Sequence, residues 1–346
     1  MRLARLDYTD VMYKSIACTA TVLLGVLATA TAHGEERRIA TIAPRGSTWM
    51  KLMERGAAAV EKATEGRITT KFYAGGVQGD ELAVVRKMRL GTLDGAALTS
   101  VGLSAIDQSI RVLQLPMMFQ DLAEMDWVRK RMWPYFRKKF AAKGYILGEP
   151  GDLGWVYLMS TFPIRTMSDL RSAKLWIWSD NPVGAYLVEK HDLEGVPLSI
   201  AEVYPGLQSG RINACHGSLL GAVALQWSSR IKYINSQPTL YGIGSMVVRK
   251  EIWDKTSAAD RKAQIRITRK LSRKLRRVVR AENETAKKAM LRKGVQMIDS
   301  TAETNQQMAQ LAHQLWDELA GKYYSKEELA MVLEWRAKYR ARKAKK

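Results

Sequence analysis

The sequence is poor in the residues that cross-link a chain or bind metals. It has 2 cysteines and 4 histidines among 346 residues. Cys18 precedes an apolar N-terminal run, so removal of that run as a signal leaves Cys215 alone and excludes a disulfide framework within one chain. The histidines, at positions 33, 191, 216 and 313, have no spacing typical of a metal site. We therefore expect neither a metal nor a cofactor.

Two further absences limit the classes of function. No segment approaches the roughly 20 uninterrupted apolar residues of a membrane-spanning helix. Gly75, Gly76 and Gly79 form a loop without the lysine and serine or threonine of a phosphate loop. Cys215 and His216 are neighbours, but adjacent residues on a strand face opposite sides, so they are a poor nucleophile and base. We expect no catalytic residue.

Basic residues are abundant and unevenly distributed. The chain has 55 Lys+Arg against 34 Asp+Glu, a formal charge of +21, and many lie along a predicted helix from Arg266 to Arg280. A solvated polar helix face is the favoured interpretation, and contact with anionic lipid headgroups or a partner protein is the alternative. Nucleic acid is not expected, because no aromatic platform or reading motif accompanies the charge. The tail from Arg340 to Lys346 is expected to be disordered.

The first 32 residues resemble a secretory signal. A basic start is followed by the small and apolar run Ile16–Ala30, and Ala30-Thr31-Ala32 fits the small-x-small rule for cleavage. We therefore expect export, cleavage near Ala32 and a periplasmic location.

Strand and helix patterns alternate after the signal. The first part predicts a strand, a helix and a second strand at Arg38–Ala43, Trp49–Thr64 and Arg67–Tyr73, then a helix at Glu81–Arg89 and a strand at Gly95–Ser100. A helix from Asp121 through Trp133 and strands at Tyr145–Leu147 and Leu153–Met159 follow, and from Ala258 onward the pattern is helical. This alternation predicts two α/β lobes around a cleft, with strand ends and loops supplying the ligand site.

A short strand at Lys174–Trp178 is a candidate cleft wall. Trp176 and Trp178 are two residues apart, so their side chains share one face of the strand. Two aromatic rings side by side at a strand end suit a binding cleft.

Several motifs recur in an order similar to that of one known family. They are Gly91-Thr-Leu-Asp94, Leu115-Pro116 before Phe119, Pro163 with Asp169-Leu170 and Lys174-Leu175, Glu202-Val-Tyr204 with Leu207 to Asn213, and Gln226-Trp227 with Lys232-Tyr233. From Ile39 to about Tyr324 the chain resembles the periplasmic solute-binding proteins of TRAP (tripartite ATP-independent periplasmic) transporters, the DctP type.

The resemblance implies an α/β, two-lobed periplasmic-binding-protein fold, type II-like, with a hinge and a long helix crossing both lobes. The implied divisions are a signal peptide at 1–32, lobe I at 33–152 plus about 238–280, lobe II at 153–237 plus about 281–340 with the C-terminal helices, and a basic tail at 341–346. The implied function is non-catalytic capture of a small solute between the lobes and its delivery to TRAP membrane permease subunits.

One position departs from the family's pattern. Members that bind organic acids carry an arginine two residues after the lysine that corresponds to Lys174, and this sequence has Trp176. An indole cannot form the bidentate pair that a guanidinium makes with a carboxylate. We therefore expect a neutral, apolar or aromatic solute. The candidate ligand-binding residues are Trp176, Trp155, Tyr157, Trp178, Asp180, His216, Ser218, Gln226, Thr48, Trp49 and Arg45, the last as the candidate for an acidic ligand.

Another class of function stays open at this point. The chain could be an exported scaffold or adaptor that binds a membrane surface or a helical-repeat periplasmic partner through its basic helices. Salt-sensitive adhesion without a small ligand would favour that alternative.

Overall fold

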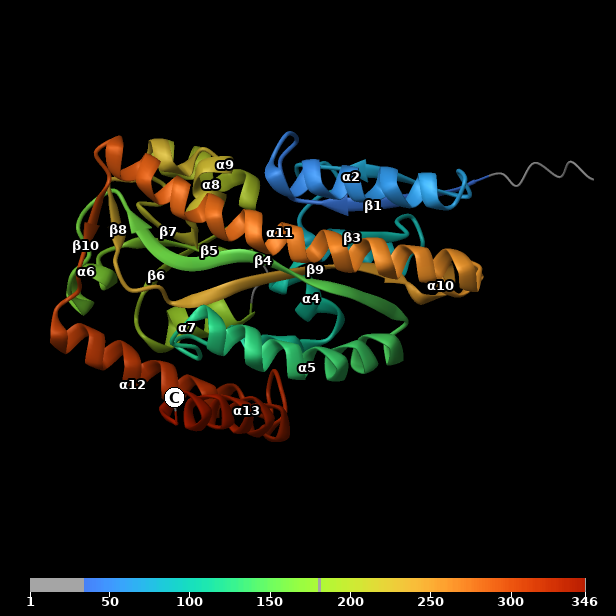
Figure 1. Cartoon of the computed structure of the whole chain (residues 1–346). Coiled ribbons are helices and arrows are strands. Elements are labelled where there is room, and N and C mark those ends of the chain that lie inside the picture. The colour runs from blue at the N-terminus through green and yellow to red at the C-terminus, as the bar shows by residue number, and fades with distance from the viewer. Residues whose placement is uncertain (1–33, 180–181, 346) are drawn as a thin grey trace, which may run out of the picture. The chain divides into compact units, whose positions relative to one another are not determined.

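The computed structural model describes residues 34–179 and 182–345, and all structural statements concern these ranges. The predicted signal segment, with its cleavage site near Ala32, lies outside the described residues. Residues from Glu36 onward form one compact unit built on a mixed β-sheet with helices on both faces (Figure 1). This architecture confirms the predicted α/β class.

The strands are β1 (Glu35–Thr41), β2 (Ile68–Tyr73), β3 (Gly95–Thr99), β4 (Tyr145–Ser160), β5 (Lys174–Trp178), β6 (Glu194–Leu198), β7 (Ala214–Ser218), β8 (Tyr233–Asn235), β9 (Leu240–Arg249) and β10 (Gln296–Ile298). Their order is β2-β1-β3-β9-β4-β7-β5-β6, with β8 pairing to β4 and β10 to β8. The pairs β1–β3, β5–β6 and β5–β7 are parallel, whereas β9 is antiparallel to β3 and β4. Two parallel groups are therefore joined through an antiparallel centre.

The helices are α2 (Thr48–Ala63), α3 (Glu81–Arg89), α4 (Ser100–Ile106), α5 (Leu122–Ala142), α6 (Met167–Arg171), α7 (Pro182–Lys190), α8 (Val203–Ser209), α9 (Leu219–Ala224), α10 (Lys250–Lys255), α11 (Ala258–Arg292), α12 (Ala302–Leu319) and α13 (Lys326–Ala344). Short 3-10 turns are η1 (Gln108–Gln114), η2 (Ile200–Glu202) and η3 (Trp227–Ser229). Among the described residues, no helix combines the length and apolarity that crossing a membrane requires.

Strand β4 belongs to both parts of the sheet. Its first portion pairs with β9, and its last portion, from Val156 to Ser160, pairs with β7. The two short strands predicted here are one strand, interrupted by register shifts between Leu147 and Pro150 and between Asp152 and Gly154. The glycines and proline of this segment are typical of a turn between two strands, but pairing with β9 keeps the strand continuous.

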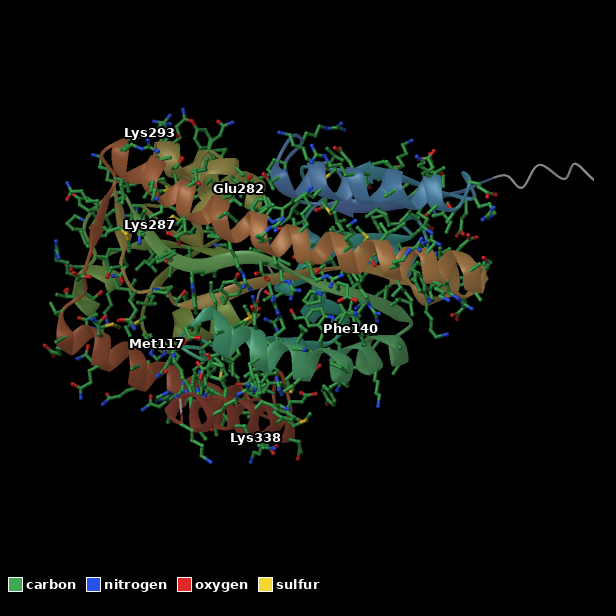
Figure 2. All side chains as sticks on the ribbon, in the orientation of Figure 1. Met117, Phe140, Glu282, Lys287, Lys293 and Lys338 are labelled. Carbon is green, nitrogen blue, oxygen red and sulfur yellow. The ribbon has the colours of Figure 1, made fainter. Side chains whose placement is uncertain are left out.

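Two helices run further than the sequence predicts. Helix α5 does not end before Pro134 but continues to Ala142, because Phe136 and Phe140 are fully buried and hold the later turns; Phe140 is labelled in Figure 2. The expected disorder of the tail is also wrong. Helix α13 continues to Ala344, where Arg340 forms an ion pair with the buried carboxylate of Glu124 at 2.6 Å.

The apolar side chains form two main cores. The first lies between β3, β4, β9, α4 and α5, and it also contains Trp316 of α12 and Val332 of α13. The second surrounds Trp176 and Trp227 and contains Cys215 and Met290. The predicted division of the chain into lobes stays a prediction, and the C-terminal helices contribute to the first core.

Helix α11 links the two parts of the sheet. It contacts α2 near its start, β4 at its middle and α9 towards its end, as Figure 1 shows. Its buried residues, among them Gln264, Val279 and Met290, face these elements. The 35 residues correspond to about 52 Å of helix, so one rigid element spans the sheet.

Candidate functional site

A cavity of about 1070 Å³ lies along the sheet and reaches the ends of four strands. The segments that line it there are Thr41–Pro44 after β1, Thr99–Val101 after β3, Trp176–Trp178 of β5 and His216–Ser218 of β7. Crevices outside the carboxyl ends of parallel strands are the usual ligand sites of α/β folds. This end of the cavity is the candidate site.

An aromatic cluster forms one wall of the site. The imidazole of His216 stacks on the indole of Trp176, with centroids 4.9 Å apart and planes 21° apart. Trp178 and Trp227 contact the same indole at 5.6 and 5.3 Å between centroids. Trp176 itself is only 1% exposed, and its N–H donates to the Leu198 carbonyl at 3.0 Å. The tryptophan therefore supports His216, which is the more exposed ring.

Burial sets the protonation of the titratable groups on β7. It lowers the pKa of His216 to about 4, so the imidazole is neutral at neutral pH. Burial also raises the pKa of the Cys215 thiol to about 12, which leaves it protonated and unreactive inside the second core. Within the described residues, no group of three or more His, Cys, Asp or Glu side chains could hold a metal ion.

The opposite wall is held by a buried carboxylate at the start of α3. Glu81 accepts hydrogen bonds from the Thr99 amide and hydroxyl, both at 2.6 Å, and from the Gly102 amide at 2.8 Å. Burial raises the pKa of Glu81 to about 7 against the opposing effect of these hydrogen bonds. Glu81 thereby fixes the turn between β3 and α4 that lines the cavity.

Two indole N–H groups connect the walls. Trp178 of β5 donates to the carboxylate of Asp80, the residue before α3, at 2.7 Å. Trp49 of α2 donates to the Asp152 carbonyl of β4 at 3.3 Å. Both tryptophans line the cavity, so the same side chains shape the site and join its sides.

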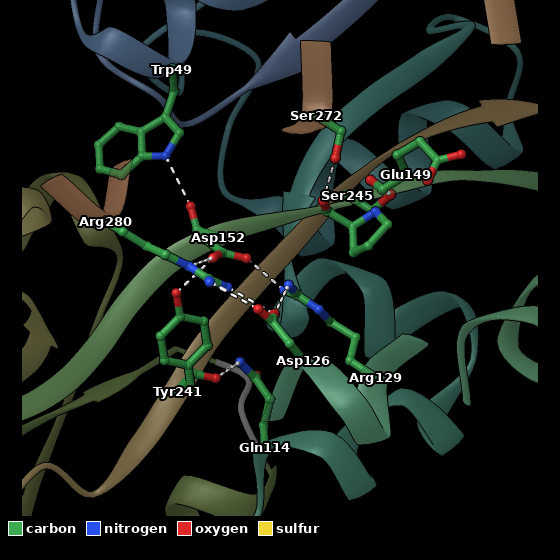
Figure 3. A network of polar contacts seen from close by, with 11 residues as sticks. Trp49, Gln114, Asp126, Arg129, Glu149, Asp152, Tyr241, Ser245, Ser272 and Arg280 are labelled. Carbon is green, nitrogen blue, oxygen red and sulfur yellow. Dashed lines mark hydrogen bonds and ion pairs between the residues drawn. The ribbon is translucent and has the colours of Figure 1, made fainter. Parts of the chain in front are cut away.

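A charge network lies at the centre of β4 (Figure 3). The side chain of Asp152 is fully buried and accepts from Arg129 at 2.5 Å, from Arg280 at 2.7 Å and from the Tyr241 hydroxyl at 2.7 Å. Asp126 receives the same two arginines at 2.7 and 2.8 Å. Burial alone would raise the pKa of Asp152, but the two guanidinium charges hold it below the ordinary value. The network fastens α5 and α11 to the strand that both parts of the sheet share.

The predicted site residues divide into three groups. Those that line the cavity are Trp49, Trp176, Trp178, His216 and Ser218. Those outside its lining are Arg45, Thr48, Trp155, Tyr157 and Gln226. Asp180 lies outside the described residues.

The residues away from the cavity have identifiable surroundings. Trp155 packs edge-on against Tyr241, with centroids 5.1 Å apart, and Tyr157 packs against the second core. Gln226 and Arg45 are exposed. Thr99 and Ser100 also line the cavity, but they were not predicted to bind a ligand. The small residues of Gly95–Ser100 are the signal that could have indicated them, because they let a ligand approach the backbone closely.

Comparison with known proteins gives consistent similarities. The family model "Bacterial extracellular solute-binding protein, family 7" (DctP) matches residues 39–322. A protein of Chromohalobacter salexigens described as a solute-binding protein is 25% identical over 244 residues, 70% of this chain and 72% of its own.

Solved structures show the same fold. A TRAP periplasmic solute-binding protein from Xanthobacter autotrophicus, with bound β-D-galacturonate, is 19% identical and aligns with a TM-score of 0.80 over 87% of this chain and 99% of its own. The sugar acid-binding protein DctPAm from Advenella mimigardefordensis, in complex with galactonate, is 17% identical, with a TM-score of 0.81 over 88% and 98%.

Proposed function

The chain belongs to family 7 of the bacterial extracellular solute-binding proteins, and on this premise we propose that it captures one small solute in the strand-end site and delivers it to a TRAP-type membrane permease. The family is non-catalytic, and the protonated, buried thiol of Cys215 is consistent with a binding role. Solute capture would couple to movement of the two walls, because a ligand shifts the population towards the arrangement that it contacts best.

The proposed solute is neutral, apolar or aromatic, and Trp176 stands where organic-acid-binding members carry arginine. The single observation that carries this proposal is the composition of the strand-end lining. Among its described segments, Thr41–Pro44, Thr99–Val101, Trp176–Trp178 and His216–Ser218, none contains lysine or arginine. The low pKa of His216 removes the remaining source of positive charge at neutral pH.

Basic residues border the same cavity elsewhere, and most of them have other partners. They are Arg37, Arg111, Arg137, Lys138 and Arg269. Arg37 donates to Gln264 and Thr256, while Arg137 and Arg269 share the carboxylate of Glu149. Because these arginines are bonded to protein side chains, we propose that shape and neutral hydrogen bonds hold the solute at the strand ends.

The proposed roles of the lining residues follow from their exposure and chemistry. The half-buried His216 and Trp49 would supply the polar and apolar contacts, and Ser218 and Trp178, which are largely buried, would contribute their remaining exposed edges. Trp176 would act as the support behind His216, because little of its own surface is exposed. The relatives with galacturonate and galactonate bind sugar acids. The decisive comparison is therefore between the affinities of this protein for an acid and for the matching neutral ligand.

Matched ligand pairs test the proposal. Native mass spectrometry of the exported protein, purified without denaturation, would give the mass of a retained solute. Calorimetric titration would then compare D-galacturonate with D-galactose, D-glucuronate with D-glucose, and succinate with the retained solute. We expect no acid to bind more tightly than its neutral counterpart. Micromolar binding of an acid that Trp176→Ala leaves unchanged would contradict the proposal.

A pair of variants separates the site from the rest of the chain. His216→Leu keeps an uncharged side chain in the lining but removes the imidazole hydrogen bond, and it should weaken binding of the retained solute by up to about tenfold. Gln226→Asn alters an exposed residue outside the lining and should leave affinity unchanged. Equal affinities for both variants would place the solute elsewhere.

A further inference from the structure

The outer face of α11 carries a concentration of positive charge that solute binding does not use. Residues 261–281 contain ten lysines and arginines and no aspartate or glutamate. Six of the basic residues are exposed and form no ion pair with a described residue, and we call them the basic stripe: Lys262, Arg266, Lys270, Arg273, Lys274 and Arg277. Their spacing of three and four residues places them on one side of the helix.

The orientation of this face is fixed by polar anchors on the opposite side of α11. The Ser272 hydroxyl donates to the Pro150 carbonyl at 2.7 Å, and the Asn283 amide donates to the Leu153 carbonyl at 3.0 Å. Arg280 is tied to Asp152 between them. Because all three bonds end on β4, the helix cannot rotate to bury the basic stripe.

Neighbouring arginines show the contrast between paired and unpaired charge. Arg269 reaches Glu149 at 3.3 Å, and Arg280 bonds both Asp126 and Asp152. None of the six residues of the basic stripe forms an ion pair with another described residue, and their charges occupy about 24 Å of helix. Glu282, Lys287 and Lys293, labelled in Figure 2, follow it towards the C-terminal end of α11, where charge of both signs returns.

A rigid line of six unpaired cations needs a partner that offers many negative charges on an extended surface. We propose that the basic stripe docks the protein on an anionic lipid bilayer. Clusters of four to eight lysines and arginines on an amphipathic helix are attracted to anionic headgroups by about 1 kcal/mol for each residue near the surface. A bilayer neutralises all six charges without requiring a complementary shape.

The composition of the stripe favours a bilayer over other polyanions. A single-stranded nucleic acid partner would need aromatic rings for base stacking, and residues 258–292 contain none. A stable protein interface would need several aromatic or other apolar anchors among the charges. Among described residues 261–281, Ile265 is the one exposed large apolar side chain, at 38%. The attraction would raise the concentration of the solute-loaded protein at the membrane surface, a role beyond capture of the solute.

Vesicle sedimentation tests the proposal with the exported, purified protein. The probes are vesicles of phosphatidylglycerol and phosphatidylcholine in a 30:70 ratio, and vesicles of phosphatidylcholine alone. We expect the protein to bind the vesicles that contain phosphatidylglycerol. This binding should fall steeply as salt is raised, because higher ionic strength shortens the screening length. Equal binding to both vesicle types, or no binding at low salt, would overturn the proposal.

Charge-matched variants separate the basic stripe from net charge. The stripe variant changes Lys262, Arg266, Lys270, Arg273 and Arg277 to glutamine, which keeps helix propensity. The control changes five exposed basic residues outside α11 to glutamine: Lys130, Arg171, Arg211, Lys232 and Lys326. We expect the stripe variant to bind anionic vesicles at least about thirtyfold more weakly, and the control less than about threefold. Equal losses would overturn the proposal.

Two measurements keep the test decisive if the stripe variant folds poorly. Hydrogen exchange of the unaltered protein on anionic vesicles should show protection confined to α11, and protection elsewhere would overturn the proposal. Tight binding to poly-L-glutamate or to a 24-nucleotide oligodeoxynucleotide, without vesicle binding, would reassign the surface to an acidic macromolecule. Native mass spectrometry of the same preparation reports solute binding separately, so the two proposals can fail independently.

Discussion

Replacing Asp152 with asparagine should expose how strongly the charge network holds the shared strand. The asparagine keeps the shape of the side chain, but it offers one acceptor oxygen where the carboxylate offers two. Arg129, whose side chain is 1% exposed, then retains only Asp126 as an acidic partner. Breaking a buried ion pair from one side costs about 3–5 kcal/mol, because the remaining charge stays desolvated. We expect the free energy of unfolding to fall by that amount.

The expected change in melting temperature follows from the size of the unit. Unfolding residues 36–346 involves an entropy on the order of 0.65 kcal/mol/K. A loss of about 3–5 kcal/mol therefore lowers Tm by about 5–8 °C, which scanning calorimetry resolves. The matched control is Asp126→Asn, which removes a carboxylate bonded to the same two arginines but 37% exposed. The control should cost about 1 kcal/mol or less.

The pH dependence gives a second measure of the same network. The folded-state pKa of Asp152 lies below the ordinary value, so its contribution to stability is present above the unfolded pKa, about 3.9, and is lost as pH falls through the lower folded pKa. The stability of the Asp152→Asn variant should therefore fall less between pH 5 and pH 2 than that of the unaltered protein. Equal losses for Asp152→Asn and Asp126→Asn, with unchanged pH profiles, would refute this reasoning.

Three further substitutions test other parts of the structure. The folded pKa of Glu81 is raised to about 7, so the contribution of Glu81 to stability is fully present below the unfolded pKa and is lost as pH rises through about 7. Thermal melts should show stability falling by up to about 3 kcal/mol between pH 4.5 and 7.5, and Glu81→Gln should flatten this slope. Trp178→Phe removes the N–H that bonds Asp80 at 2.7 Å and should cost about 1.5–3 kcal/mol in urea unfolding, because the acceptor is charged; an unchanged midpoint would show that this bond adds no net stability. Arg340→Ala leaves the carboxylate of Glu124, 1% exposed, without its ion pair and should cost about 2–3 kcal/mol, whereas truncation after Arg340 should cost less than about 1 kcal/mol; a reversed order would favour a disordered tail.

Local signals allowed much of the fold to be predicted from the sequence. The bounds of α3 and β5 match their predictions, because an Asp80 cap opens the helix and a short apolar alternation marks the strand. The continuity of β4 could not be read locally. Its hydrogen bonds come from β9, and the segment around Pro150 and Gly154 has the composition of a turn. Pairing between distant segments overrides local propensity in such cases.

The candidate site was predictable only in part for a related reason. Strand alternation placed Trp176 and Trp178 together correctly, and both line the cavity. Trp155 was also a candidate ligand-binding residue, but its ring packs against Tyr241 of β9, a residue far away in the sequence. The ligand-binding roles themselves stay predictions, since they depend on the solute. The charge network was missed because Asp126, Asp152 and Arg280 come from three separate elements.

The shared central strands also constrain the order in which the chain can fold. Gly95 of β3 pairs with Val248 of β9, and Tyr145 of β4 pairs with Arg249. The first part of the sheet is therefore incomplete until the chain as far as Arg249 is available, so it cannot mature while the nascent chain is shorter. Pairings between such distant segments slow folding. A chain that folds slowly stays unfolded for longer, and an unfolded chain is the form that a translocation channel can thread.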